Sequence, residues 1–242
     1  MSLENINQQR PVVAVILPAL NEEQAIGKVI REIPKKVLEE NGFSVKTIVV
    51  DNDSVDRTKI IAEENTATVI KELRRGKGYA VKTGIASVDA DYFFLMDADY
   101  TYPPSHIVEM LHLLKHNHVV IGSRVRGHRE KNSLKLLNLM GVIFLSLAAT
   151  IIYQRPISDI CSGYWGLRGE VARQLNLNAM GFDVEARLFS EITRKKFSIV
   201  ELPINYRRRM GGEPKLRPFR DGLRILRVLL ADRFKTSDGN EN

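Results

Sequence analysis

Short apolar runs alternate with helix-like segments through the first half of this chain. Because a strand, a crossing helix and a second parallel strand form one right-handed unit, this alternation favours a parallel sheet with helices on its faces. We expect strands at residues 12–17, 47–51, 68–70, 92–97 and 119–123, and helices at residues 23–36, 58–64, 78–87 and 105–115. The pattern therefore predicts an α/β fold with a mostly parallel central sheet flanked by helices.

The length and composition indicate one globular domain. The chain has 242 residues, of which 44% are hydrophobic and 27% charged, which excludes a disordered or collagen-like protein. We expect a single domain over residues 10–235 and a disordered tail over residues 236–242. The single cysteine, Cys161, permits no intramolecular disulfide, and the polar N-terminus lacks an apolar signal core. Both features favour the cytoplasm.

The net charge of +7 is concentrated in two stretches. Five basic residues lie between Arg124 and Lys135, and eight lie between Arg207 and Arg227. Such patches attract phosphates, an acidic membrane surface or nucleic acid. No aromatic-interleaved RNA motif or zinc-finger spacing accompanies them, so nucleic acid is the least favoured of these partners.

Two segments of the second half could contact a membrane. Residues 134–153 form an apolar segment whose last 18 residues approach the length of a membrane span, yet include Asn138, Gly141, Ser146 and Thr150. The basic flank suits an interfacial helix, and a buried core helix is the alternative. Residues 218–235 form a basic amphipathic helix, which could face the membrane or simply pack on the domain surface.

Acidic and amide side chains follow three of the expected strands. Asp97-Ala98-Asp99 closes an apolar run, and two carboxylates two residues apart in a strand would project from one side. Such hard oxygen ligands suit Mg²⁺ or Mn²⁺ that also binds phosphate oxygens. Residues 18–23 and 51–58 bring further polar groups to the same edge, where they could contact a base or ribose, or cap helices.

The segment from Arg74 to Gly78 combines glycines with cations and is suited to a diphosphate. It is not a P-loop, because no Ser or Thr follows Lys77 and the upstream glycine is absent. No Gly-x-Gly-x-x-Gly follows the first strand, which disfavours a dinucleotide oxidoreductase.

Taken in order, these motifs resemble those of family 2 glycosyltransferases with the GT-A fold, in the branch of dolichyl-phosphate and polyprenyl-phosphate sugar synthases. The resemblance covers residues 12–221. It rests on the segments at residues 18–22, 50–58, 76–81, 97–104, 122–124, 161–164, 181–185 and 209–215.

The resemblance implies roles for individual residues. Asp97 and Asp99 would hold Mg²⁺ or Mn²⁺. Nucleotide-sugar contacts would come from Pro18, Ala19, Asn21, Glu22, Asp51, Asp53, Lys77, Gly78, Asp97 and Ala98. The acceptor phosphate would meet Arg124, Arg209 and Lys215. The chain departs from the family pattern at Asn52, where Asp is usual, at Arg57 in place of Gly, and at Thr101 in place of a Gln that ligates metal in some relatives.

The resemblance implies an inverting transfer of a hexose from a nucleotide sugar of the GDP-mannose or UDP-glucose type to polyprenyl or dolichyl phosphate, at the cytoplasmic face of a membrane. A phosphate acceptor is already anionic at neutral pH and needs no general base. A soluble hydroxyl acceptor such as phosphoglycerate is an alternative, and it would need a base, for which Asp183 and Glu185 are candidates. A nonenzymatic module that binds membranes or polyanions is the third hypothesis.

Overall fold

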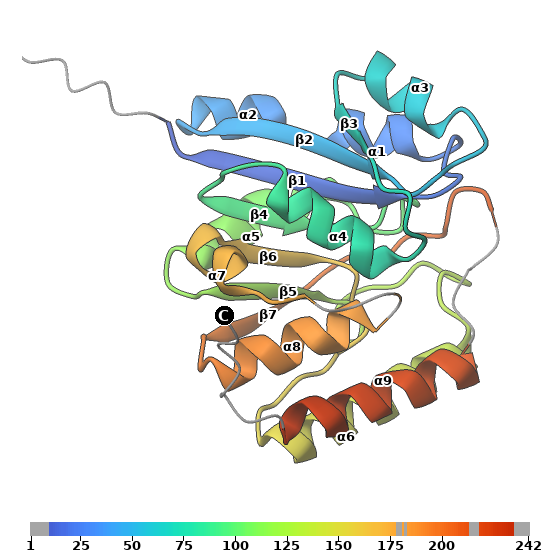
Figure 1. Ribbon diagram of the computed structural model, residues 1–242, viewed down its shortest axis with the longest axis vertical. Coiled ribbons are helices and arrows are strands. Elements are labelled where there is room, and N and C mark those ends of the chain that lie inside the picture. The colour runs from blue at the N-terminus through green and yellow to red at the C-terminus, as the bar shows by residue number, and fades with distance from the viewer. Residues whose placement is uncertain (1–9, 178–180, 182, 213–217, 235–242) are drawn as a thin grey trace, which may run out of the picture.

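A seven-stranded sheet with the strand order β3-β2-β1-β4-β6-β5-β7 forms the centre of the computed structural model (Figure 1), which describes residues 10–177, 181, 183–212 and 218–234. The strands are β1 (Val12–Ala19), β2 (Ser44–Asp51), β3 (Thr68–Lys71), β4 (Tyr92–Leu95), β5 (Val119–Ser123), β6 (Trp165–Arg168) and β7 (Ile199–Pro203). All neighbouring pairs are parallel except those of β6, which runs antiparallel to both β4 and β5. The predicted α/β fold with a mostly parallel sheet is confirmed.

Helices cover both faces of this sheet. They are α1 (Ile26–Glu32), α2 (Lys35–Glu40), α3 (Thr58–Glu64), α4 (Lys77–Ala86), the 3₁₀ helix η1 (Pro104–His106), α5 (Ile107–Leu114), α6 (Leu136–Tyr153), α7 (Gly169–Gln174), α8 (Val184–Arg194) and α9 (Pro218–Arg233). The alternating residues of β1 divide between two cores. Val13 and Val15 pack in the core that includes α1 and α5, whereas Ala14 and Ile16 pack in the core that includes α4 and α8. A strand buried on both faces explains the continuous apolar runs in the sequence.

Several predicted boundaries were wrong, among them those of the first helix and of the fourth strand. The helix expected over residues 23–36 is divided into α1 and α2, because Pro34 disfavours the helical conformation of the residue before it and Ile33 is extended (φ −60°, ψ 125°). The fourth strand ends at Leu95 rather than at Asp97. Asp97 and Asp99 therefore lie in the loop after the strand, at a bend over residues 98–100 in which Tyr100 has a φ of 73°.

The second half contains elements that periodicity did not reveal. The strands β6 and β7 have only four and five residues, and β6 lies between β4 and β5. The predicted fourth and fifth strands are consequently not neighbours. Helices α7 and α8 were also missed.

The predicted apolar segment 134–153 forms helix α6, which lies beside α9 at the bottom of Figure 1. The two helices are joined near their C-terminal ends, where the Arg233 Nε donates to the Ile152 carbonyl oxygen (3.0 Å) and the Tyr153 hydroxyl donates to the Leu229 carbonyl oxygen (3.0 Å). Residues 236–242, the expected tail, lie outside the described residues.

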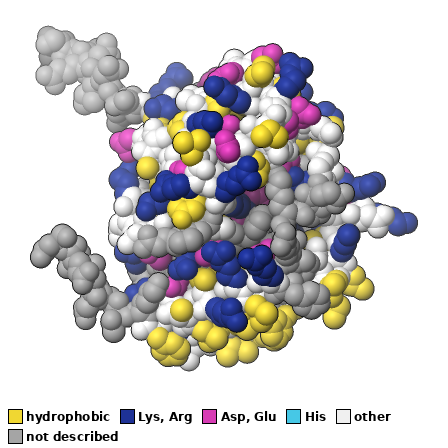
Figure 2. All heavy atoms as spheres, turned by 45° about the vertical axis from the view of Figure 1, so that its right-hand side comes forward, with side chains coloured by type: hydrophobic (Ala, Val, Ile, Leu, Met, Phe, Trp, Pro, Cys, Tyr) yellow, Lys and Arg dark blue, Asp and Glu magenta, His cyan; other side chains and the backbone are white. Residues whose placement is uncertain are grey.

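Helix α6 has one buried and one exposed apolar face. Val142, Leu145 and Ala149 are buried in the core. The opposite stripe of large apolar side chains is exposed and consists of Leu136, Leu137, Met140, Ile143, Phe144, Leu147 and Ile151. We call this stripe the α6 apolar face. Figure 2 shows hydrophobic side chains gathered at the lower end of the molecule, with Lys and Arg side chains above them. By length and composition α6 could also cross a membrane, and 28% of it is buried in the protein.

Candidate active site

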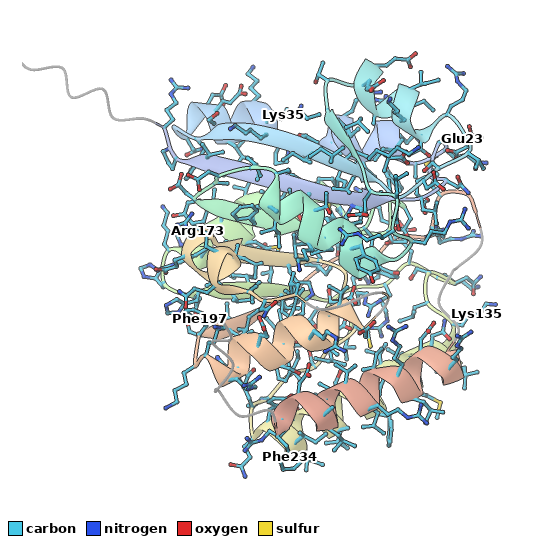
Figure 3. All side chains as sticks on the ribbon, in the orientation of Figure 1. Glu23, Lys35, Lys135, Arg173, Phe197 and Phe234 are labelled. Carbon is cyan, nitrogen blue, oxygen red and sulfur yellow. The ribbon has the colours of Figure 1, made fainter. Side chains whose placement is uncertain are left out.

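The carboxyl ends of β2, β1 and β4 lie side by side because β1 pairs in parallel with both neighbours. The loops after these strands hold the polar residues that the sequence indicated. Figure 3 shows Glu23, in the loop after β1, and Lys135, just before α6, on this same side of the molecule. The apolar helix thus begins on the side where the acidic loops converge.

The loops after β1 and β2 are bonded to each other. The backbone N–H of Asn21 donates to the Ser54 hydroxyl (2.9 Å), and the Asn21 side-chain oxygen accepts from the backbone N–H of Val55 (2.9 Å). The backbone N–H of Glu22 donates to the Thr58 hydroxyl (2.8 Å). Asn21 adopts a left-handed conformation (φ 51°) that an Asn tolerates well. These bonds fix the loops as one unit.

The remaining residues predicted at the nucleoside lie around this unit. Pro18 is half-buried and Ala19 is buried at the end of β1. Asp51 is buried and accepts a bond from the Ser54 backbone N–H (3.2 Å). Asp53 is half-exposed and lies 3.6 Å from the Lys71 ammonium.

Lys77 connects two carboxylates from distant parts of the chain. As the first residue of α4, it places its Nζ 2.5 Å from the Asp97 Oδ1 and 2.5 Å from the Glu185 Oε1. Burial acts to lower the pKa of Lys77, but attraction to the two carboxylates outweighs it and raises the pKa. Burial raises the pKa of Glu185, which Lys77 opposes. Lys77 is therefore a fixed cation, and Glu185 joins the site from α8.

A second cation, Arg209, bridges Asp99 and Glu22. Its Nη1 lies 2.6 Å from the Asp99 Oδ2, its Nη2 forms an ion pair with the Glu22 carboxylate, and its Nε donates to the Gly211 carbonyl oxygen (3.0 Å). Burial lowers the Arg209 pKa, but the two carboxylates outweigh burial and raise it. Burial and the neighbouring Asp97 charge raise the pKa of Asp99. Among the described residues, the four carboxylates of Glu22, Asp97, Asp99 and Glu185 thus contact the two cations Lys77 and Arg209.

Two residues beside the acidic pair were not predicted as site residues. Gly163 packs so closely on Asp97 that a Cβ at this position would lie 2.2 Å from the Asp97 Oδ2. The Gly163 N–H donates to the Tyr102 hydroxyl (2.8 Å). Thr101, which stands where some relatives have a metal-ligating Gln, donates a hydrogen bond from its hydroxyl to the Asp99 Oδ1 (2.6 Å) and so orients that carboxylate. The motif around Gly163 was visible in the sequence, but its contact with Asp97 was not.

The donor set fits a divalent cation that is shared with a ligand. Asp97 and Asp99 offer hard oxygen atoms, and a bound cation would stabilise the ionised form of Asp99, whose pKa is raised by burial and by repulsion from Asp97. Among the described residues, no group of three or more His, Cys, Asp or Glu side chains is placed to hold a metal ion. Magnesium commonly binds through one or two carboxylates together with substrate phosphates, so this pair is compatible with a metal that reaches the site with a diphosphate.

Arg124 is buried and paired with Asp159. Its Nε and Nη2 form a bidentate bond to the Asp159 carboxylate (2.7 Å each), and its guanidinium lies over the Tyr206 ring, 5.3 Å from the ring centroid. The sequence indicated Arg124 but not Asp159. Lys215, the third predicted acceptor contact, lies outside the described residues.

The two candidate bases occupy different environments. The Asp183 carboxylate is buried and accepts bonds from Arg187 (2.9 Å) and Arg224 (3.2 Å), so it connects α8 to α9. Glu185 alone of the two contacts Lys77. Glu185 therefore belongs to the acidic site, whereas Asp183 pairs with Arg187 of α8 and Arg224 of α9.

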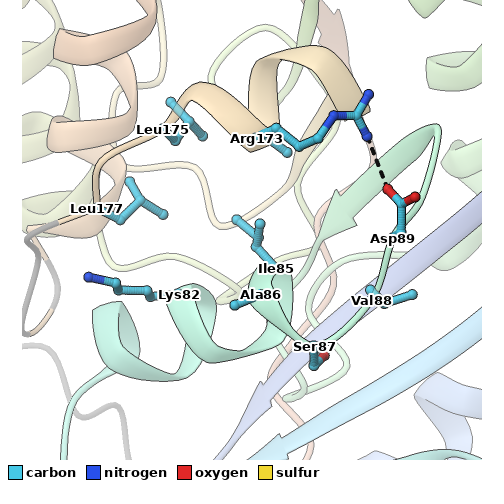
Figure 4. Close-up of a pocket in the computed structure, with 10 residues that line it drawn as sticks. Lys82, Ile85, Ala86, Ser87, Val88, Asp89, Arg173, Leu175 and Leu177 are labelled. Atoms are coloured by element: carbon cyan, nitrogen blue, oxygen red, sulfur yellow. Dashed lines mark hydrogen bonds and ion pairs between the residues drawn. The ribbon is translucent and has the colours of Figure 1, made fainter.

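A separate hollow lies between α4 and α7 (Figure 4), lined by Lys82, Ile85, Ala86, Ser87, Val88, Asp89, Ala172, Arg173, Leu175 and Leu177. The Arg173 guanidinium and the Asp89 carboxylate form an ion pair there (3.1 Å). Lys77 begins α4, whereas this hollow lies at the other end of that helix. It is not part of the acidic site.

Comparison with known proteins identifies related sequences and folds. The sequence model described as "Glycosyl transferase family 2" matches residues 14–175. The chain is 32% identical over 216 residues to a dolichol-phosphate mannosyltransferase of Pyrococcus furiosus. The matched region covers 85% of this chain and 59% of that protein. It is 31% identical over 225 residues to a low-salt glycan biosynthesis hexosyltransferase of Haloferax volcanii, covering 92% of this chain and 54% of that protein. The chain therefore spans little more than half of these two relatives.

A shorter relative and a solved structure match along most of their length. A dolichyl-phosphate hexose transferase of Haloferax volcanii is 30% identical over 228 residues, covering 92% of this chain and 96% of that protein. A glucosyl-3-phosphoglycerate synthase of Mycobacterium tuberculosis, solved with Mn²⁺, uridine diphosphate and glucosyl-3-phosphoglycerate, superposes with a TM-score of 0.72 at 22% identity, covering 95% of this chain and 82% of that one. At that identity the likeness concerns the fold.

Proposed function

Because this chain belongs to glycosyl transferase family 2, we propose that it transfers a hexose from a nucleoside-diphosphate sugar to polyprenyl or dolichyl phosphate at a membrane surface. The observation that carries the proposal is the juxtaposition of an acidic pair, a fixed cation and a helix with an exposed apolar face. Asp97 and Asp99 lie at the carboxyl edge of the sheet, Arg209 bridges Asp99 to Glu22, and α6 begins on the same side.

The α6 apolar face supports a lipid acceptor rather than a soluble one. Its exposed side chains recur every three or four residues, so they form one continuous stripe along the helix. Exposed Arg220 and Arg227 on the adjacent α9 add positive charge, as do Arg126 and Lys135 before α6. An apolar stripe flanked by cations is the arrangement expected of a protein that lies on an anionic membrane surface. The unpaired Cys161 fits the reducing, cytoplasmic face of that membrane.

In this proposal the loops after β1 and β2 hold the nucleoside, and Lys77 neutralises the diphosphate. Asp97 and Asp99 would hold Mg²⁺ or Mn²⁺, which supplies charge neutralisation of the departing diphosphate. Lys77 already lies between Asp97 and Glu185, so it is oriented before the donor binds. Gly163 leaves no free space on one side of Asp97 and so keeps that carboxylate in place.

Arg209 is the cation that we assign to the acceptor phosphate. A phosphate oxygen attacks the anomeric carbon, a new carbon–oxygen bond forms, and the bond from that carbon to the nucleoside diphosphate breaks with inversion. A phosphate monoester is largely dianionic at pH 7, so no proton must be removed and the protein needs to supply only position and charge. Arg124 is paired with Asp159, so it would have to exchange that partner to contact an acceptor phosphate.

A hydroxyl acceptor is the second candidate, and the position of Glu185 favours it. This carboxylate is buried in the site and its pKa is raised by burial, as is suitable for a group that takes a proton. The fold likeness to glucosyl-3-phosphoglycerate synthase is compatible with this candidate. Here the acceptor O–H proton would pass to Glu185 as the oxygen bonds to the anomeric carbon and the bond from that carbon to the nucleoside diphosphate breaks.

An acceptor competition assay tests the proposal. Purified protein with Mn²⁺ is incubated with GDP-mannose and with UDP-glucose, each in the presence of polyprenyl phosphate or 3-phosphoglycerate, and labelled product is measured in the organic and aqueous phases. We expect product in the organic phase and its loss on chelation. Product in the aqueous phase alone would favour the hydroxyl acceptor, and membrane binding without any transfer would favour the nonenzymatic module.

A further inference from the structure

Asn52, directly after β2, is bonded through both ends of its side-chain amide. The buried Asn52 Nδ2 donates to the carbonyl oxygens of Glu72 (2.9 Å) and Arg74 (2.8 Å), and its Oδ1 accepts from the backbone N–H of Gly76 (2.7 Å). All three partners belong to residues 72–76, which we call the basic loop. In this chain the amide donates twice and accepts once, which the ionised carboxylate that is usual at this position in the family could not do, because it has no donor.

The basic loop carries cations to the start of α4. Arg74 and Arg75 are exposed, and Gly76 precedes Lys77 with a φ of 140°, a conformation that favours glycine. The loop is held from the other side by Glu72, whose carboxylate accepts from the Arg74 guanidinium (2.7 and 2.9 Å) and from the Thr83 hydroxyl (2.5 Å).

The C-terminal end of α4 is fixed by its packing against the sheet. The basic loop therefore determines the position of the N-terminal end of the helix. A Cβ on Gly84 would lie 2.3 Å from the Ile16 Cγ2, which shows how closely α4 approaches the sheet there. Lys77 reaches Asp97 and Glu185 at 2.5 Å from the first position of the helix. A displacement of the loop by about 1 Å would therefore shift Lys77 relative to both carboxylates, and misplacement on this scale is costly at a binding site.

We propose that Asn52 is a positioning residue that holds the basic loop, and with it Lys77, in the geometry that receives the donor diphosphate. The inference rests on the proposed function for the identity of the ligand, whereas the loop contacts are independent of it. Asn52 itself is covered by the loop, so it acts through Gly76 and Lys77.

Asn52→Asp is the informative substitution because it preserves size and keeps the acceptor for Gly76. It removes both donated bonds and sets a carboxylate against two carbonyl oxygens, which raises the folded-state pKa of the new acid. A protonated acid regains one donor. The defect is therefore largest at high pH and decreases as pH falls through that raised pKa.

The primary test measures nucleoside diphosphate binding. Calorimetric titration of UDP and of GDP with Mn²⁺ compares the wild type, Asn52→Asp and the control Asn65→Asp at pH 8 and pH 5.5. Asn65 donates to the Ile61 carbonyl oxygen (2.8 Å) and accepts from Arg31 (2.8 Å), so the control makes the same chemical change at the end of α3. We expect Asn52→Asp to weaken binding roughly tenfold or more at pH 8 relative to the wild type, with partial recovery at pH 5.5.

Trypsin cleavage provides a readout that does not depend on any ligand. Arg74 and Arg75 are exposed cleavage sites within the basic loop, and release of the loop should accelerate cleavage after them several-fold in Asn52→Asp but not in Asn65→Asp. Should Asn52→Asp show faster cleavage at every site, which indicates global unfolding, Asn52→Ser replaces it in both measurements.

The outcomes separate the inference from the proposed function. Affinity and loop cleavage equal to those of the wild type would overturn the inference, as would a weakened affinity with no pH dependence and an intact loop. If the wild type binds no nucleoside diphosphate while cleavage of the loop still depends on Asn52, the proposed function fails and the structural role of Asn52 is retained. Unaltered cleavage in that case would refute both.

Discussion

The α6 apolar face should control membrane binding, and replacing two of its side chains tests this directly. Phe144 and Leu147 lie one turn apart and are 61% and 58% exposed in the protein. Because they contribute little to the core, Phe144→Ser and Leu147→Ser together should leave the fold intact, since exposed substitutions usually change the free energy of unfolding by only about 0.5 kcal/mol each.

The size of the effect follows from the exposed area. Transfer of a whole Leu or Phe side chain from water to an apolar phase contributes ~1.5–3 kcal/mol. Slightly more than half of each side chain is accessible, so each should contribute ~1–2 kcal/mol to partitioning, and the pair ~2–4 kcal/mol. At about 1.4 kcal/mol per factor of ten, the double variant should bind vesicles between roughly 30-fold and roughly 1000-fold more weakly.

Co-sedimentation with vesicles of phosphatidylcholine and phosphatidylserine measures this partitioning. Val55→Ser with Ile60→Ser is the matched control, because these apolar side chains are 86% and 48% exposed but lie before and within α3. We expect the control to bind like the wild type, and both to be released by high salt, which screens attraction to the anionic surface.

Two results would refute this reasoning. Equal binding of the Phe144 and Leu147 double variant and the wild type would show that the α6 apolar face does not contact the lipid. Retention of the wild type after carbonate extraction would instead indicate that α6 spans the bilayer.

Three further predictions concern the acidic site, and a fourth concerns the basic loop. Asp99→Asn should lower turnover at limiting Mn²⁺ by more than about tenfold without lowering the melting temperature by more than a few degrees, and unchanged turnover would contradict its role. Arg209→Ala should mainly raise the KM for polyprenyl phosphate, while Glu185→Gln should leave the basic limb of the pH profile intact; the reverse pattern would favour a hydroxyl acceptor. Gly163→Ala should displace Asp97 and reduce Mn²⁺-dependent nucleotide binding, measured by calorimetry, because its Cβ has no room. Hydrogen bonds from Arg74 and Thr83 lower the pKa of Glu72 to about 2, so Glu72→Gln should be destabilised in urea at pH 7, by a margin that disappears as pH falls from 4.5 toward 2.

The sequence was sufficient for the fold class because its signal is local. The apolar runs before Asn21, Asp51 and Asp97 are largely buried, and such runs alternate with helices. Parallel pairing then requires their carboxyl ends to share one edge. The order of strands and helices along the chain therefore indicates that the acidic and amide residues after these strands lie close together.

The sequence did not reveal which cation pairs with which carboxylate. Lys77 and Glu185 are 108 positions apart, and Arg209 and Asp99 are 110 apart. Nothing in the local pattern distinguishes Glu185, which reaches the site, from Asp183, which connects α8 to α9. Similarly, the local sequence around Arg124 gives no sign of Asp159, which lies 35 positions away and neutralises that cation.

Local sequence determined the order of strands and helices in the first half of the chain and which residue types collect at the edge of the sheet, because apolar periodicity and turn residues act over a few positions. Only the tertiary structure decided the partners of those residues, the insertion of β6 between β4 and β5, and the side of α6 that remains exposed. An ion pair or a packed helix face depends on how distant segments approach one another, and that approach is set by the burial of the whole core rather than by any one segment.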